Sequence, residues 1–208
     1  GIKMTASMKI QAVIDRKPSA SFCLAAALGL WTLLIFTAGT GMCAPSDSRL
    51  DFTLPVPEKT HHRQYLGLEP GTTFSLGQIR AQVVIIEIFS MYCPVCQREA
   101  ARVNQVFDLI QARKNLRDTV KLIGIGAGNS DFEVAFFKEK YAIEFPLFSD
   151  GDFVIHKKIG EVRTPHFFGL KLDQTGEFSV FYSRSGDISD PEAFLETILS
   201  PVGMDVTP

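Results

Sequence analysis

Cysteine and net charge are both scarce in this sequence, and their scarcity excludes several classes of protein. The four cysteines among 208 residues are too few for a disulfide-dense scaffold. The formal net charge of −2 gives no electrostatic reason to expect nucleic-acid binding. A hydrophobic fraction of 46% excludes a disordered chain, and there is no collagen-like period, internal repeat or low-complexity tract. The length predicts one folded domain with an appendage.

Charged residues are also absent from one long segment, residues 18–46, which follows a basic start. This pattern is typical of an export signal or a membrane anchor. Residues 1–45 are therefore predicted to be a cleaved signal peptide or an anchor that enters the membrane through residues 18–44. Lipid attachment at Cys43 is a third alternative. Each of these would place the rest of the chain outside the cytoplasm, in the periplasm or an equivalent compartment.

The remainder of the chain is predicted to divide into a linker over 46–71, a folded domain over 72–201 and a short tail over 202–208. The linker is proline-rich and polar. Within the domain, apolar periodicity predicts strands at 72–76, 82–90, 120–125, 145–148, 166–172 and 177–182, and helices at 94–114, 153–159 and 191–199. Ser130 is a predicted N-cap for a further helix that carries Phe132, Phe136 and Phe137. This alternation predicts an α/β fold with a central sheet and helices on both faces.

The motif that carries chemistry is Cys93-Pro94-Val95-Cys96, at the junction between the buried strand 82–90 and the helix that follows. The spacing puts both sulfurs within one helical turn. A thiolate at a helix N-terminus is stabilised by free N–H groups and by the helix dipole, so Cys93 should have a lowered pKa and act as the nucleophile. Cys96 is one turn further in and would resolve a mixed disulfide by attacking Cys93. A structural disulfide and half of a zinc site are competing interpretations, although no second pair of metal ligands follows.

Four further features agree with this interpretation. Glu87 interrupts the apolar strand six residues before Cys93, and Glu99 follows Cys96 by three. Thr164-Pro165 stands directly before the strand at 166–172, and a terminal hairpin follows. Together with the motif, residues 72–200 resemble the thioredoxin-fold thiol–disulfide oxidoreductases, and most closely the TlpA/ResA-like (redoxin) branch.

The resemblance implies a mixed sheet with one extra β-α insertion and a role for each of these residues. Pro165 would be cis and face the disulfide, and the Thr164 backbone would pair with an extended substrate. Tyr92, Pro94 and Val95 would contact the partner. A buried carboxylate has a raised pKa, so Glu87 near two sulfurs would take the proton from Cys96. For Glu99, the residues alone leave open an exposed helix acid, and for Tyr92 they leave open simple packing.

The sequence thus predicts an exported enzyme that exchanges its Cys93/Cys96 dithiol or disulfide with cysteines of exported proteins, with apocytochromes c among the candidates. It needs no metal and no cofactor beyond the redox-active disulfide, but it needs a membrane thiol or electron-transfer partner. Two alternatives are a peroxiredoxin-type thiol peroxidase, for which Arg163 is the candidate arginine, and a thioredoxin-fold module that handles Cu(I). The direction of electron flow stays open, because proline directly follows Cys93 rather than preceding Cys96.

Overall fold

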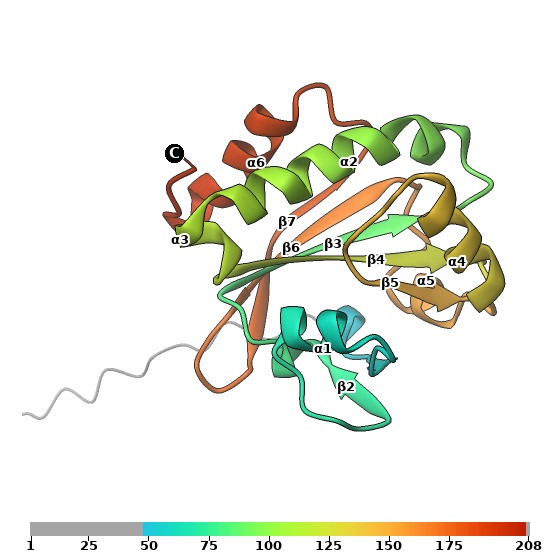
Figure 1. Ribbon diagram of the computed structural model, residues 1–208, viewed down its shortest axis with the longest axis horizontal. Coiled ribbons are helices and arrows are strands. Elements are labelled where there is room, and N and C mark those ends of the chain that lie inside the picture. Colours follow the sequence, from blue (N-terminus) through green and yellow to red (C-terminus); the bar gives the residue numbers. More distant parts are fainter. Residues whose placement is uncertain (1–47, 207–208) are drawn as a thin grey trace, which may run out of the picture. The chain divides into compact units, whose positions relative to one another are not determined.

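A five-stranded mixed sheet organises residues 48–206, the part of the chain that the computed structural model describes (Figure 1). The strands lie in the order β5-β4-β3-β6-β7. Their bounds are β3 Val83–Phe89, β4 Val120–Ala127, β5 Leu147–Asp150, β6 His166–Leu172 and β7 Phe178–Ser185. The strands β3, β4 and β5 are parallel, whereas β6 is antiparallel to β3 and to β7. The central strand β3 is buried along its whole length, which explains its continuous apolar sequence.

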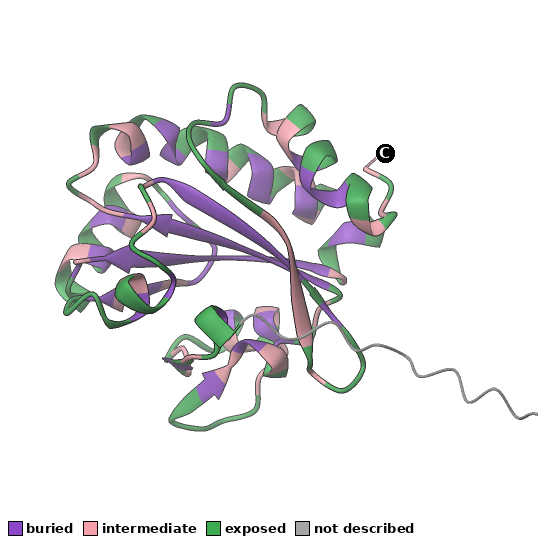
Figure 2. Ribbon diagram, turned by 180° about the vertical axis from the view of Figure 1, so that it is seen from behind, coloured by how far each residue is buried: buried purple, intermediate pink, exposed green. Residues whose placement is uncertain are grey.

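Helices and a small lobe cover the two faces of this sheet. One face packs against α2 Pro94–Ala112, α3 Lys114–Arg117, α4 Asp131–Lys140 and α6 Pro191–Leu199, which contribute to one apolar cluster. The other face packs against α5 Val154–Lys158 and the first part of the described chain, which form the second cluster. Figure 2 shows the buried strands between these two layers. The predicted central sheet with helices on both faces is observed.

The segment predicted to be a linker forms short regular elements that pack on the domain. Residues 46–71 contain a 3-10 turn at Ser48–Leu50, the strand β1 Thr53–Pro55 and the helix α1 Thr60–Leu66. β1 pairs with β2 Thr73–Ser75, and a further 3-10 turn follows at Leu76–Gln78. The side chains of Leu50, Leu54 and Leu66 are at most 1% exposed. The secondary structure of this segment is hard to predict from the sequence because the prolines break its apolar periodicity. Its few leucines still supply enough apolar surface to cover one face of the sheet.

The helix predicted after Ser130 is α4, with Ser130 as its N-cap. The Ser130 hydroxyl accepts a hydrogen bond from the Glu133 N–H, and the Glu133 carboxylate bonds back to the Ser130 N–H in a capping box. Of the three phenylalanines that this helix carries, Phe137 is buried, whereas Phe132 is 78% and Phe136 46% exposed. Only one side of α4 faces the sheet.

The predicted signal or anchor, including Cys43, lies outside the described residues. Across residues 48–206, no helix has the length and apolar character needed to cross a bilayer. A 3-10 turn at Ser200–Val202 leads into the predicted tail.

Candidate active site

The Cys93-Pro94-Val95-Cys96 motif occupies the point where β3 ends and α2 begins. Cys93 is the N-cap of α2, and Pro94 is the first helical residue, where its missing N–H removes no hydrogen bond. Both cysteines are free thiols. Pro94 is exposed and Val95 is half-buried, so both residues of the motif interior reach the surface. The strand-to-helix junction inferred from the sequence is therefore present, with the nucleophile candidate at the helix N-terminus.

The hydrogen bonds that the Cys93 sulfur accepts favour its ionisation, whereas the bond that its thiol donates stabilises the protonated form. The Cys96 N–H donates to Cys93 Sγ at 3.3 Å, and the Cys93 thiol donates to the Thr164 carbonyl oxygen at 3.4 Å. Burial acts to raise the pKa of Cys93, but hydrogen bonds with the side chain of Thr164, with the backbone and side chain of Cys96 and with the backbone of Val95 outweigh it. The pKa of Cys93 is therefore lowered from its ordinary value, as the sequence predicted.

Cys96 differs from Cys93 in both its exposure and the direction of its pKa shift. Its side chain is 0% exposed. Burial, followed by the thiol of Cys93 and the charge of Glu87, raises the pKa of Cys96 well above the ordinary value. Of the two sulfurs, Cys93 is thus both the accessible one and the more acidic one.

The loop that contains Thr164 and Pro165 lies beside Cys93 because of the sheet topology. β6 starts directly after Pro165 and runs antiparallel to β3, with His166 opposite Ile88. The start of β6 therefore meets the end of β3 that leads to the motif. The Thr164–Pro165 peptide bond is cis, as the resemblance implied. Pro165 is buried and Thr164 half-buried.

Glu87 is a buried acid in the middle of the sheet. Glu87 lies two residues from Ile85 and two from Phe89, and side chains two apart in a strand share a face of the sheet. Because Ile85 and Phe89 belong to the cluster on the α2 face, the Glu87 side chain also points toward α2. Burial, then the charges of Glu99 and Cys93, raises the pKa of Glu87 from 4.5 to about 8. Glu87 is therefore mostly protonated at neutral pH and is electrostatically coupled to both cysteines.

Glu99 is buried rather than exposed, which differs from one of the two interpretations left open by the sequence. Its side chain accepts a hydrogen bond from the Ile188 N–H at 2.9 Å and pairs with Arg102 at 2.8 Å. Ile188 belongs to the loop between β7 and α6, 89 residues away. Glu99 therefore ties this loop to the second turn of α2.

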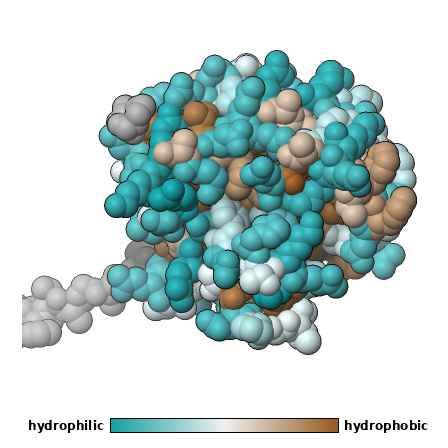
Figure 3. All heavy atoms as spheres, viewed as in Figure 1, coloured by the Kyte–Doolittle hydropathy of each residue, from teal (hydrophilic) through white to brown (hydrophobic). Residues whose placement is uncertain are grey.

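Tyr92 stands next to the nucleophile with 65% of its surface exposed. Its hydroxyl donates a hydrogen bond to the Glu133 carboxylate at the start of α4. Exposed Phe132 and Phe136 lie on the same helix, and Figure 3 shows hydrophobic residues at the surface on the α4 side. Simple core packing is therefore not the role of Tyr92, and its ring is available to a partner.

The loop before Cys93 is held by a residue that the sequence analysis did not single out. The side chain of Asn129 is 0% exposed, and its Oδ1 accepts a hydrogen bond from the Met91 N–H at 2.8 Å. Asn129 follows β4, which is parallel to β3, so the two strand ends and their loops meet at one edge. The pattern of a polar residue after a buried strand could have signalled this contact.

A groove of about 340 Å³ adjoins the motif, and half of its lining residues were not predicted from the sequence. It lies between Val95 and Arg98 of α2, residues 163–165 of the cis-proline loop, and residues 185–187 after β7. The Gly186 N–H donates to the Pro165 carbonyl at 3.0 Å, and its φ of 130° is one that favours glycine. No local sequence signal marks this groove, because three distant segments form it.

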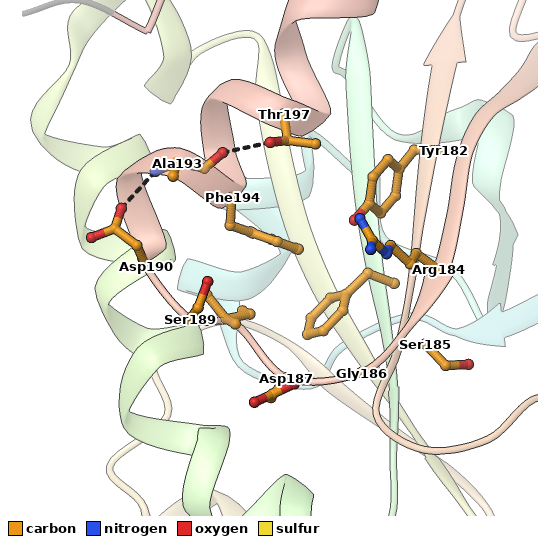
Figure 4. A pocket seen from close by; sticks show the side chains of 12 residues that line it. Tyr182, Arg184, Ser185, Gly186, Asp187, Ser189, Asp190, Ala193, Phe194 and Thr197 are labelled. Carbon is orange, nitrogen blue, oxygen red and sulfur yellow. Dashed lines mark hydrogen bonds between the residues drawn. The ribbon is translucent and has the colours of Figure 1, made fainter.

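A second hollow of about 350 Å³ shares Ser185, Gly186 and Asp187 with this groove. Figure 4 shows Tyr182 and Arg184 of β7 on one side of it, and residues of α6 on the other. Asp190 accepts a hydrogen bond from the Ala193 N–H and caps α6.

Within residues 48–206, no group of three or more His, Cys, Asp or Glu side chains is arranged to hold a metal ion.

The chain belongs to the AhpC/TSA family, whose model matches residues 45–181. The thiol–disulfide oxidoreductase ResA of Geobacillus thermodenitrificans (strain NG80-2) is 22% identical over 175 residues, which cover 84% of this chain and 90% of ResA. The family match includes residues 46–71, the segment predicted from the sequence to be a linker.

Two solved structures show the fold. A putative thiol:disulfide interchange protein DsbE from Chlorobium tepidum matches with a TM-score of 0.55 and 20% identity, over 77% of this chain and 99% of its own. A secreted disulfide oxidoreductase of Mycobacterium tuberculosis, homologous to E. coli DsbE, matches with a TM-score of 0.53 and 18% identity, over 74% and 99%. The predicted thioredoxin-like fold is therefore confirmed.

Proposed function

We propose that this member of the AhpC/TSA family is a thiol–disulfide oxidoreductase that exchanges its Cys93/Cys96 pair with cysteines of other proteins. The observation that carries the proposal is the contrast between the two sulfurs. Cys93 is accessible with a lowered pKa, and Cys96 lies one turn away, buried with a raised pKa. Exchange needs this asymmetry, because one thiolate must attack the partner while the other waits to release it.

In the reductive direction, the Cys93 thiolate attacks one sulfur of a partner disulfide. The partner's S–S bond breaks, a Cys93–partner disulfide forms, and the second partner sulfur leaves as a thiolate that takes up a proton. Deprotonated Cys96 then attacks Cys93 Sγ, which closes the Cys93–Cys96 disulfide and releases the first partner sulfur. Two electrons pass from the dithiol to the partner. The oxidative direction is the reverse of these steps.

The second step requires Cys96 to lose a proton that its environment holds tightly. We assign the acceptance of this proton to the ionised fraction of Glu87, because its carboxyl group is coupled to Cys96 and its pKa of about 8 leaves part of it ionised near physiological pH. A general base works best when its pKa lies near the working pH. Glu99 contributes through its charge, which adds to the raised pKa of Glu87.

The partner segment would lie against Thr164, Pro165, Val95 and Tyr92, which surround Cys93. Thr164 contacts the Cys93 sulfur through its carbonyl, so a segment that presents a sulfur to Cys93 must pass beside the Thr164 backbone. Pro165 has no N–H that would compete for the partner's carbonyl groups. Pro94 and Tyr92 are exposed and would provide apolar contact.

The N-terminal sequence supports an extracytoplasmic location for this activity. The uncharged segment 18–46 after a basic start suits export or anchoring, and one of the structurally similar proteins is described as secreted. Partners would then be exported proteins with cysteines, apocytochromes c among them, and a membrane thiol or electron-transfer protein would exchange electrons with the pair. Reduction of a Cys-x-x-Cys-His peptide disulfide tests the cytochrome c assignment.

The deciding experiment titrates the Cys93/Cys96 couple of the full-length chain in glutathione and dithiothreitol redox buffers. A reversible two-electron couple is expected. A potential near ~−270 mV indicates a reductant, and one near ~−120 mV indicates an oxidant of partner proteins. The Cys96→Ser variant should accumulate a mixed disulfide on Cys93 with a model substrate, and Cys93→Ser should not.

Failure to observe a reversible couple would contradict the proposal. Rapid peroxide-driven formation of sulfenic acid on Cys93 would then favour the thiol peroxidase. Stoichiometric Cu(I) binding without disulfide exchange would favour the metal-handling module.

A further inference from the structure

The groove beside Cys93 carries an unusual balance of charge for this chain. From residue 44 onward the sequence has 17 basic and 22 acidic side chains, so the domain as a whole is acidic. The groove lining instead contains two arginines, Arg98 and Arg163, against one acid, Asp187. Among the described residues, neither arginine takes part in an ion pair.

The two arginines approach the groove from different segments. Arg98 lies on α2, and its guanidinium donates a hydrogen bond to the Pro94 carbonyl at 3.2 Å, which holds it next to the motif. Arg163 directly precedes Thr164 and is exposed. A guanidinium has five N–H donors, so Arg98 keeps most of its donors after this one bond. Both cations therefore face the space that a segment bound to Cys93 would occupy.

We propose that Arg98 and Arg163 select partner proteins whose reactive cysteine is flanked by acidic side chains. The proposal rests on the proposed function and names its substrate class. An extended segment advances by about 3.3 Å per residue, so residues adjacent to the substrate cysteine fall within the groove while the cysteine meets Cys93. A carboxylate there meets two guanidinium groups, whereas an ammonium group meets like charges. The rest of the acidic domain would otherwise disfavour such a substrate.

The test uses three peptides that share one length and one internal disulfide. The residues on either side of the first cysteine are Glu in one peptide, Gln in the second and Lys in the third. The full-length chain is reduced, freed of reductant and mixed with each peptide, and acid-quenched samples are resolved by chromatography. The readout is the ratio of second-order rate constants for the Glu and Lys peptides, measured at about 0.02 M and about 0.5 M salt.

We expect the Glu peptide to react about tenfold faster than the Lys peptide at low salt, since two exposed charge pairs each contribute a few-fold. High salt should bring the ratio close to one. The double variant Arg98→Gln/Arg163→Gln should do the same at low salt. Arg117→Gln is the matched control, because it removes one positive charge on α3, outside the groove, and should leave the ratio unchanged.

Equal rates for the three peptides would overturn this inference while leaving the proposed function intact. A ratio that persists in the double variant would also overturn it, because the preference would then arise elsewhere. Failure of all three peptides to react, together with the absence of a reversible Cys93/Cys96 couple, would overturn the proposed function itself.

Discussion

The thiol of Cys93 donates a hydrogen bond to the carbonyl oxygen of Thr164 across 3.4 Å, although 71 residues separate the two in the sequence. This contact joins the start of α2 to the loop before β6. It places the nucleophile candidate directly beside the cis peptide bond between Thr164 and Pro165. The candidate site is therefore built from two segments that meet only because β3 and β6 are neighbours in the sheet.

Cys93 should react with iodoacetamide at least about 100-fold faster than Cys96 at pH 7, because thiolate content and access both favour it. Cys96 is 0% exposed and has a raised pKa. Mass spectrometry of the reduced protein after timed alkylation measures both rates. Comparable rates for the two cysteines would contradict the roles assigned to them.

Glu87 should make the folded protein less stable as pH rises. The pKa of Glu87 is about 8 in the folded protein, against 4.5 ordinarily, so between these values the folded state holds a proton that the unfolded chain has lost. The free energy of unfolding then falls as pH rises through this window, by a few kcal/mol in total.

Urea unfolding of the reduced protein at pH 5 and pH 8 tests this effect. The isosteric Glu87→Gln variant should lose most of the decline, while Glu139→Gln, at an exposed position on α4, should retain it. An equal decline in wild type and Glu87→Gln would show that another group titrates.

Glu99→Ala should destabilise the protein by about 1–3 kcal/mol, because it leaves the Ile188 N–H buried without an acceptor. Glu99→Gln keeps a carbonyl oxygen in place and should cost less. Hydrogen exchange at the Ile188 amide should accelerate strongly in the alanine variant and weakly in the glutamine variant. The same rate in both variants would mean that this hydrogen bond does not hold the loop.

Asn129→Ala should loosen the turn that leads to Cys93. The substitution removes the acceptor for the Met91 N–H, with an expected loss of about 1–3 kcal/mol and faster exchange of the Met91 amide. Asn115→Ala is the matched control, because Asn115 is exposed and its side chain bonds to the Asp205 carbonyl, far along the chain. Unchanged exchange at Met91 would contradict the role of Asn129.

Much of the fold was predictable because its signals are local. The run of β-branched residues in β3, the apolar stripe of α2 and the caps at Ser130 and Asp190 each lie within a few consecutive residues. Residues 46–71 were harder, since short elements broken by prolines have no readable period. Their place in the core depends on the sheet face that they cover.

The sequence by itself determined the chemistry of this protein. It places two cysteines one turn apart at the start of a helix, an acid in the strand before them, and a proline before a later strand. Only the tertiary structure decided what those residues meet. The Cys93–Thr164 contact, the Glu99–Ile188 bond and the groove between Arg98 and Arg163 join segments far apart in the chain. Periodicity encodes which face of an element is buried, whereas strand order and packing decide which distant residues come together.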